Sequence, residues 1–106
     1  MPKMMVKASY TAEGARGLVK EGGTGRRDSV TKVIEGFGGK VEAFYFAYGA
    51  DDAFVIVDVP DEATGLALAI AVNASGSVTC TTTPLITPET MDAACKKTVS
   101  YKAPGA

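Results

Sequence analysis

The side chains that could carry acid–base chemistry in this chain are carboxylates, tyrosines and lysines, because the sequence contains no histidine. Without an imidazole the chain cannot build a Ser-His or Cys-His nucleophile, or a metal site with a histidine ligand. The strongest candidates for a general acid or base are Tyr45, Asp58 and Lys7, each on a predicted strand. We favour a partly buried structural ion pair between Lys7 and Asp58 over a catalytic role for them.

A second group of carboxylates stands in the segment Gly49-Ala50-Asp51-Asp52. Adjacent carboxylates can bind a divalent cation or share a proton. Aspartate is also a common turn residue, and consecutive side chains on a strand point in opposite directions. We therefore favour a tight turn over a metal site here, and the sequence predicts neither a metal nor another cofactor.

The glycine-rich segment Gly22-Gly23-Thr24-Gly25 is followed by Arg26-Arg27. Backbone N–H groups of such a segment can hold an anion at the start of a helix. The segment fits neither the G-x-x-x-x-G-K-[ST] pattern nor a G-x-G-x-x-G pattern that follows a strand. We favour a flexible break in a helix, and a mobile lid over a ligand site is the alternative.

The elements that must position these residues follow from alternation and from helical periodicity. Strands are predicted at residues 3–11, 40–48, 53–59 and 77–85, and helices at 12–21, 26–37, 61–74 and 87–97. A buried stripe is predicted from Val30, Val33, Ile34 and Phe37, and Leu66 and Ile70 are expected to face inward on the next helix.

The order of these elements is β-α-β-β-α-β with an additional C-terminal helix. It indicates an α+β fold, the ferredoxin-like plan in which two helices cover one face of a four-stranded antiparallel sheet. The length of 106 residues suits one domain. We place that domain at residues 1–97 and expect residues 98–106 to be a loose tail.

The alternation of side chains assigns the two faces of this sheet. A turn of two or four residues at 49–52 would pair Phe44 with Val57 and Tyr45 with Ile56, and would place the apolar side chains of Phe44, Phe46, Val55 and Val57 against the helices. The face left open would carry Met5, Lys7, Ser9, Ala43, Tyr45, Ala47, Phe54, Ile56, Asp58, Thr79, Thr81 and Thr83. Its apolar members should not stand exposed together on a monomer. We therefore expect a two-fold dimer that packs sheet to sheet.

Composition excludes several classes of function. The 11 basic and 12 acidic residues give a net charge of −1, which argues against binding to nucleic acid. No apolar run approaches the roughly 20 residues that span a bilayer, and the N-terminus does not resemble a signal peptide. We therefore expect a cytoplasmic protein without membrane contact, in which Cys80 and Cys95 are reduced thiols.

Several short motifs, in a specific order and spacing, resemble the GYD domain family between residues 4 and 87. They are Tyr10-Thr11, Gly14, Gly38-Gly39-Lys40-Val41, Ala43-Phe44-Tyr45, Gly49, Asp52, Pro60-Asp61 and Gly76-Ser77-Val78. The resemblance implies a dimeric α/β barrel of largely undefined function. The Gly-x-Tyr-Asp motif that names the family is altered here, because Asp51 replaces the tyrosine.

Two classes of function fit these observations. The first is a small homo-oligomeric protein that binds a partly apolar molecule inside the dimeric barrel or serves as an assembly module, with Ser9, Phe54, Ile56 and Thr81 as candidate pocket residues. The alternative is a cofactor-free isomerase or oxygenase with low turnover that uses Asp58 or Tyr45 as its acid or base. A purely structural subunit would be indicated by a barrel interior filled with side chains.

Overall fold

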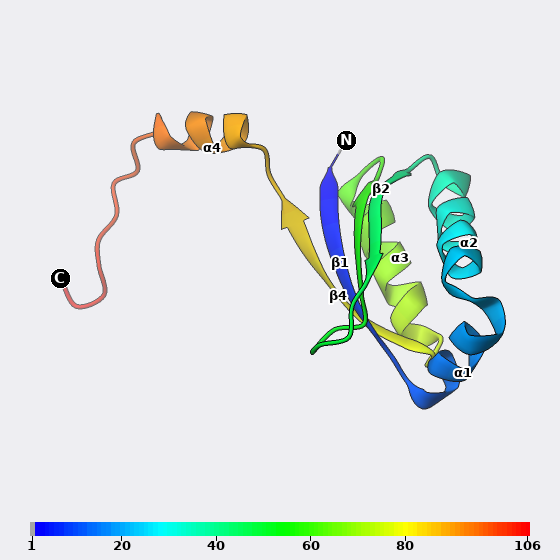
Figure 1. Ribbon diagram of the computed structural model, residues 1–106. Coiled ribbons are helices and arrows are strands. Elements are labelled where there is room, and N and C mark those ends of the chain that lie inside the picture. The colour runs from blue at the N-terminus through cyan, green and yellow to red at the C-terminus, as the bar shows by residue number, and fades with distance from the viewer. Residues whose placement is uncertain (1) are drawn as a thin grey trace.

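Four strands form one antiparallel sheet in the order β2-β3-β1-β4 in the computed structural model, which describes residues 2–106 (Figure 1). The strands are β1 (Lys3–Tyr10), β2 (Lys40–Phe46), β3 (Ala53–Asp58) and β4 (Val78–Leu85). The helices are α1 (Ala12–Glu21), α2 (Gly23–Gly36), α3 (Glu62–Ala74) and α4 (Pro88–Cys95). This order confirms the α+β, ferredoxin-like fold that the sequence predicts.

Three helices begin at residues whose side chains accept a hydrogen bond from the backbone of the first turn. The Thr11 hydroxyl accepts from the N–H of Gly14, the Asp61 carboxylate from that of Thr64, and the Thr87 hydroxyl from that of Thr90. The hydrogen bond from Thr64 also lowers the pKa of Asp61. These contacts satisfy N–H groups that have no partner within the helix, and Asp61 caps α3 as its position before the apolar run predicts.

The glycine-rich segment breaks the helix at one residue only. Gly22 has a φ of +79°, and it both ends α1 and precedes the first residue of α2. Only glycine adopts this backbone conformation without a steric cost. Gly23, Thr24 and Gly25 already belong to the first turn of α2, so the helix begins three residues earlier than expected.

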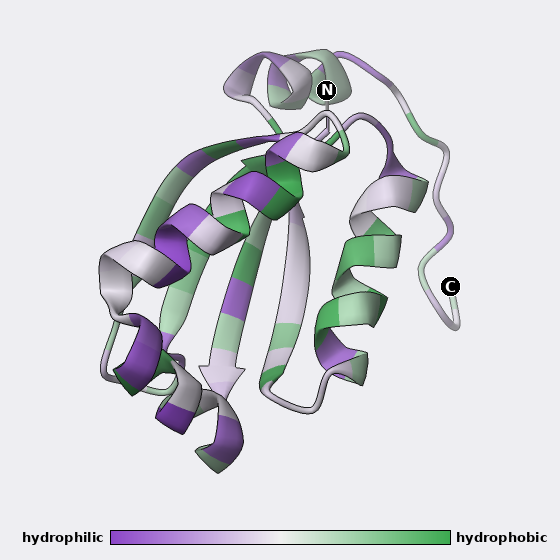
Figure 2. Ribbon diagram, turned by 90° about the vertical axis from the view of Figure 1, so that its right-hand side faces the viewer, coloured by the Kyte–Doolittle hydropathy of each residue, from purple (hydrophilic) through white to green (hydrophobic). Residues whose placement is uncertain are grey.

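Two helices cover one face of the sheet, one near each edge. Helix α2 packs over β2 and α3 packs over β4, and the strands are visible in the space between the two helices (Figure 2). The centre of the core contains Ile34 from α2 with Val57 and Val59, all at most 2% exposed. Val33, expected to be buried, is 55% exposed.

The prediction for the inward face of α3 was wrong. Leu66 and Ile70 are each 61% exposed, whereas Gly65, Leu68, Ala69 and Val72 face the sheet. A side chain at position 65 would collide with Met4, because a Cβ built there lies 2.9 Å from its Sδ and Cε atoms. The missing side chain at Gly65 therefore lets α3 approach β1 on this face.

The predicted faces of the β2–β3 hairpin are correct, but its predicted register is displaced by two residues. Phe44 lies opposite Val55 and Tyr45 opposite Phe54. The connection is a six-residue loop at 47–52 rather than a tight turn, so each residue of β2 meets a partner two positions earlier. A shift of two residues preserves the face of every side chain. The register changes again between Val41 and Ala43, where β2 has an irregularity.

Residues 86–106 form an arm that stands away from the sheet and helices. The arm comprises α4 and the tail, and Figure 1 shows it on the side of the sheet opposite to α2 and α3. The radius of gyration is 17.0 Å, compared with about 13 Å for a compact domain of this length. Ile86, Met91, Val99 and Tyr101 of this arm are all more than half exposed.

Candidate functional site

The sheet has one face without helices, which we call the free face. It carries Met5, Lys7 and Ser9 of β1, Ala43 and Tyr45 of β2, Phe54, Ile56 and Asp58 of β3, and Thr79, Thr81 and Thr83 of β4, as the register and the helix-facing residues require. These are the open-face residues predicted for the four strands, except for Ala47, which lies in the loop after β2. The assignment was possible because the side chains of a strand alternate between its faces.

The register arranges the free face in rows that cross the four strands. Thr81, Lys7, Phe54 and Tyr45 form one row, and Thr83, Met5, Ile56 and Ala43 form the next. Met5, Phe54 and Ile56 therefore make an apolar centre, and each is only partly buried. Tyr45 lies at one side of this centre and is 71% exposed. Threonines occupy the opposite side, on β4.

The partner of Asp58 is Lys3, so the expected ion pair with Lys7 was wrong. The Lys3 Nζ atom lies 2.9 Å from the Asp58 Oδ1 atom and also contacts the carboxylate of Glu42. The hydrogen bond with Glu42, together with the one to Asp58, raises the pKa of Lys3. Lys7 instead lies opposite Phe54, four residues from Asp58 along β3, which is a separation of about 13 Å.

The same geometry keeps Tyr45 and Asp58 apart. Tyr45 lies opposite Phe54, so about 13 Å of β3 separates its row from the row of Asp58. Two groups that exchange protons with one reacting atom must each lie within about 3 Å of it. Within one chain, therefore, the two candidates do not form an acid–base pair. Ser9 and Thr81 lie nearer to Lys7, on the same and the adjacent strand.

The loop at 47–52 is held to the sheet by Asp52. Its Oδ2 atom accepts a hydrogen bond of 2.8 Å from the backbone N–H of Tyr10, and its own N–H donates to the carbonyl of Ala8. These bonds give Asp52 a structural function. Gly49 and Asp51 lie in the same loop, and between residues 2 and 106 no cluster of His, Cys, Asp or Glu is placed to hold a metal ion.

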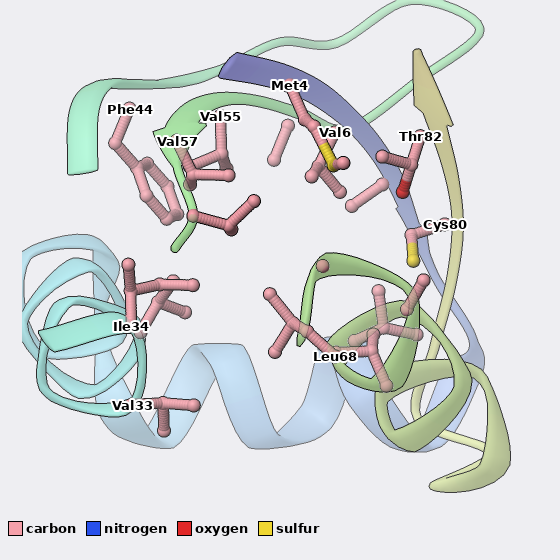
Figure 3. A pocket seen from close by; sticks show the side chains of 18 of the residues that line it. Met4, Val6, Val33, Ile34, Phe44, Val55, Val57, Leu68, Cys80 and Thr82 are labelled. Carbon is pink, nitrogen blue, oxygen red and sulfur yellow. The ribbon is translucent and has the colours of Figure 1, made fainter. Parts of the chain in front are cut away.

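A cavity of about 180 Å³ lies on the other face of the sheet, between the strands and helices α2 and α3 (Figure 3). This cavity was not predicted from the sequence. Met4, Val55 and Val57 project into it from the sheet, and Ile34 and Leu68 approach from the helices (Figure 3). Three of its lining residues are alanines, Ala8, Ala53 and Ala69, and small side chains at core positions were the one signal for it in the sequence. Cys80 also lines the cavity, and burial raises the pKa of its thiol.

The fold and the free face define a small ferredoxin-like domain, and comparison with known proteins supplies its family. The GYD domain profile matches residues 4–95, so this chain belongs to the GYD domain family. The crystal structure of MtbAldR is similar, with a TM-score of 0.56 and 25% sequence identity over 81% of this chain. This chain spans about half of that protein, since the match covers 52% of it. No curated protein matches significantly.

No helix among residues 2–106 is long and apolar enough to cross a membrane.

Proposed function

We propose that this protein is a homodimeric binding and assembly module, in which two copies pack their free faces together about a two-fold axis. The main support for this proposal is the apolar centre of the free face, where Met5, Phe54 and Ile56 lie side by side on adjacent strands. An apolar patch in the middle of a surface, bordered by threonines and by the charged Lys3–Asp58 pair, is the usual anatomy of an interface.

The C-terminal arm supports the same proposal. A free face at most about 19 Å by about 26 Å offers about 500 Å² for contact, less than the roughly 800 Å² per partner of a standard interface. The arm lies on the same side of the sheet as the free face (Figure 1). It carries exposed apolar side chains at Ile86, Met91, Val99 and Tyr101. A second copy seated on the free face would meet this arm, which supplies the missing area.

The free face also suits a small, partly apolar molecule enclosed between the two sheets. The row of Thr81, Lys7, Phe54 and Tyr45 places hydroxyl and ammonium groups beside two aromatic rings. Such a row can bury an apolar body and orient one polar group. The geometry supports catalysis less well, because Asp58 is paired with Lys3 and Tyr45 lies about 13 Å away along the strand.

The experiment that tests the dimer places a charge at the centre of the free face. Ile56→Lys introduces an ammonium group that a sheet-to-sheet interface would have to bury without a partner. We expect this variant to have the mass of one chain by light scattering at micromolar concentration. Val19→Lys is the matched control, because Val19 is an exposed valine on α1, 85% accessible and away from the free face. An Ile56→Lys variant that remains a folded dimer contradicts the proposal.

A further inference from the structure

The cavity between the sheet, α2 and α3 is a separate site from the free face. Its floor is formed by strand residues that alternate with those of the free face, such as Met4, Val6, Val55 and Val57. Its walls come from α2 and α3, and Figure 3 shows Ile34 and Leu68 on opposite sides of the open space. A molecule bound here would therefore lie on the helix side of the sheet, and its binding does not require the dimer.

The size of the cavity indicates the size of its ligand. Its volume is about 180 Å³, and an apolar cavity of about 150 Å³ is enough to hold benzene. A space of this kind requires a molecule of roughly six to nine non-hydrogen atoms. Long chains and drug-sized ligands do not fit, because their sites usually measure about 300 Å³ or more.

The walls of the cavity indicate the chemistry of its ligand. Most lining residues are aliphatic, with two aromatic rings, from Phe44 and Tyr10. Arg26 is the only formally charged side chain among them, and there is no carboxylate or lysine. The hydroxyls of Tyr10, Ser29 and Thr82 are the other polar groups. Water gains few hydrogen bonds in such a space, and a cation would have no counter-charge there.

The cavity exists because several lining side chains are small. Ala8, Ala53 and Ala69 end at their Cβ atoms on β1, β3 and α3. Helices α2 and α3 pack on the same face of the sheet, over its two edge strands β2 and β4, and so leave the space between them open. An apolar space that side chains do not fill costs stability in proportion to its volume, and a ligand of the right shape reduces that cost.

From these observations we infer that the space between the sheet, α2 and α3 is a binding site for a small apolar molecule that carries no positive charge, of the size of a monocyclic aromatic or a short branched aliphatic compound. The ligand would contact the methyl groups of Val55, Val57 and Leu68. Toluene is a suitable probe because it is neutral and has seven carbon atoms. Benzylamine, a cation at neutral pH, is its charged counterpart of similar shape.

The test is a titration with toluene, followed by NMR of the methyl groups. We expect saturable shifts at Val55, Val57 and Leu68, none at the exposed Val19, and binding of benzylamine at least tenfold weaker. Ala69→Leu should fill the cavity and weaken toluene binding at least tenfold. Ala71 lies on the same helix but is exposed and outside the cavity. Ala71→Leu should therefore change the affinity for toluene less than twofold.

Three results would overturn the inference. The first is the absence of saturable shifts at the cavity methyl groups of the unmodified protein, a measurement that does not depend on the folding of any variant. The second is toluene binding that Ala69→Leu and Ala71→Leu weaken equally. The third is binding of benzylamine as tight as that of toluene, which would contradict the assignment of a ligand without positive charge.

Discussion

The carboxylate of Asp52 accepts a 2.8 Å hydrogen bond from the backbone N–H of Tyr10, which fixes the β2–β3 loop to the end of β1. The backbone N–H of Asp52 donates to the carbonyl of Ala8, and its carbonyl accepts from the N–H of Ala47. Asp52 therefore connects the loop with β1 and also bonds the two ends of the loop to each other. The aspartate of the altered Gly49-Ala50-Asp51-Asp52 motif has a structural function that does not require the missing tyrosine.

Replacement of Asp52 should destabilise the fold, whereas replacement of its neighbour should not. A hydrogen bond to a charged group contributes about 1.5–3 kcal/mol, so Asp52→Ala should lower the free energy of unfolding by about that amount. Asp51→Ala should change it by about 0.5 kcal/mol or less, as is usual for surface positions. Urea unfolding monitored by circular dichroism measures both. Equal effects of the two substitutions would show that the hydrogen bond between Asp52 and Tyr10 contributes nothing to the free energy of unfolding.

Two glycines of α1 should respond to alanine in opposite directions. A Cβ at Gly14 would lie 1.9 Å from the carbonyl oxygen of Ser77, whereas a Cβ at Gly17 meets no atom within 4 Å. Gly14→Ala should therefore cost about 1–3 kcal/mol by forcing α1 away from the start of β4. Gly17→Ala should stabilise the protein by about 0.5–1 kcal/mol through helix propensity. The close approach of α1 to β4 would be disproved by a Gly14→Ala variant as stable as Gly17→Ala.

The ion pairs of Lys3 should make stability depend on alkaline pH. The hydrogen bonds with Glu42 and Asp58 raise the pKa of Lys3 in the folded state above its ordinary value of 10.5. The folded state thus holds this proton more tightly, so the stabilisation is complete below pH 10.5 and is lost as pH rises through the higher folded-state value. Lys3→Met should therefore lose less stability than the native protein above pH 10.5.

The control for this experiment is Lys32→Met, which removes an exposed lysine of α2. Urea midpoints measured at neutral pH and at pH values above 10.5 give the comparison. Lys32→Met should retain the full alkaline loss of stability. If Lys3→Met shows the same alkaline loss as Lys32→Met, the contacts of Lys3 with Glu42 and Asp58 have no energetic effect.

Much of this fold was predictable because its signals are local. Strict alternation in β1 and β3 identifies their inward and outward residues, and a cap such as Asp61 identifies the start of a helix. The register of β2 against β3 was not predictable in this way, because it depends on the loop length. That loop is six residues long, since Asp52 binds to β1 instead of closing a tight turn.

The orientation of α3 and the presence of the cavity could not be predicted from local sequence patterns. Residues 66–72 of α3 are apolar on every side, so their periodicity does not select an inward face. The selection comes from Gly65, which permits close contact with Met4. The partner of Asp58 likewise depends on the pairing of β1 with β3, which places Lys3 rather than Lys7 opposite it. The cavity depends on the distance between two helices, which no short segment determines.

The arm should contribute to dimerisation through its apolar side chains. Met91 of α4 is 52% exposed in the single chain, and a second copy on the free face would bury it. Met91→Glu should weaken the dimer at least tenfold, as measured by sedimentation at several concentrations. Ala93→Glu adds the same charge on another side of α4 and should change the dissociation constant less than threefold. Equal weakening by both would assign the effect to charge alone.

The mass of the unmodified protein in solution distinguishes a dimer from a single chain without any substitution. The chain has a mass of 10.9 kDa, and light scattering coupled to size-exclusion chromatography at micromolar concentration should give twice that value, or a multiple of the dimer. This mass should persist on dilution through the low micromolar range. A mass of one chain under these conditions would contradict the proposed pairing of the free faces.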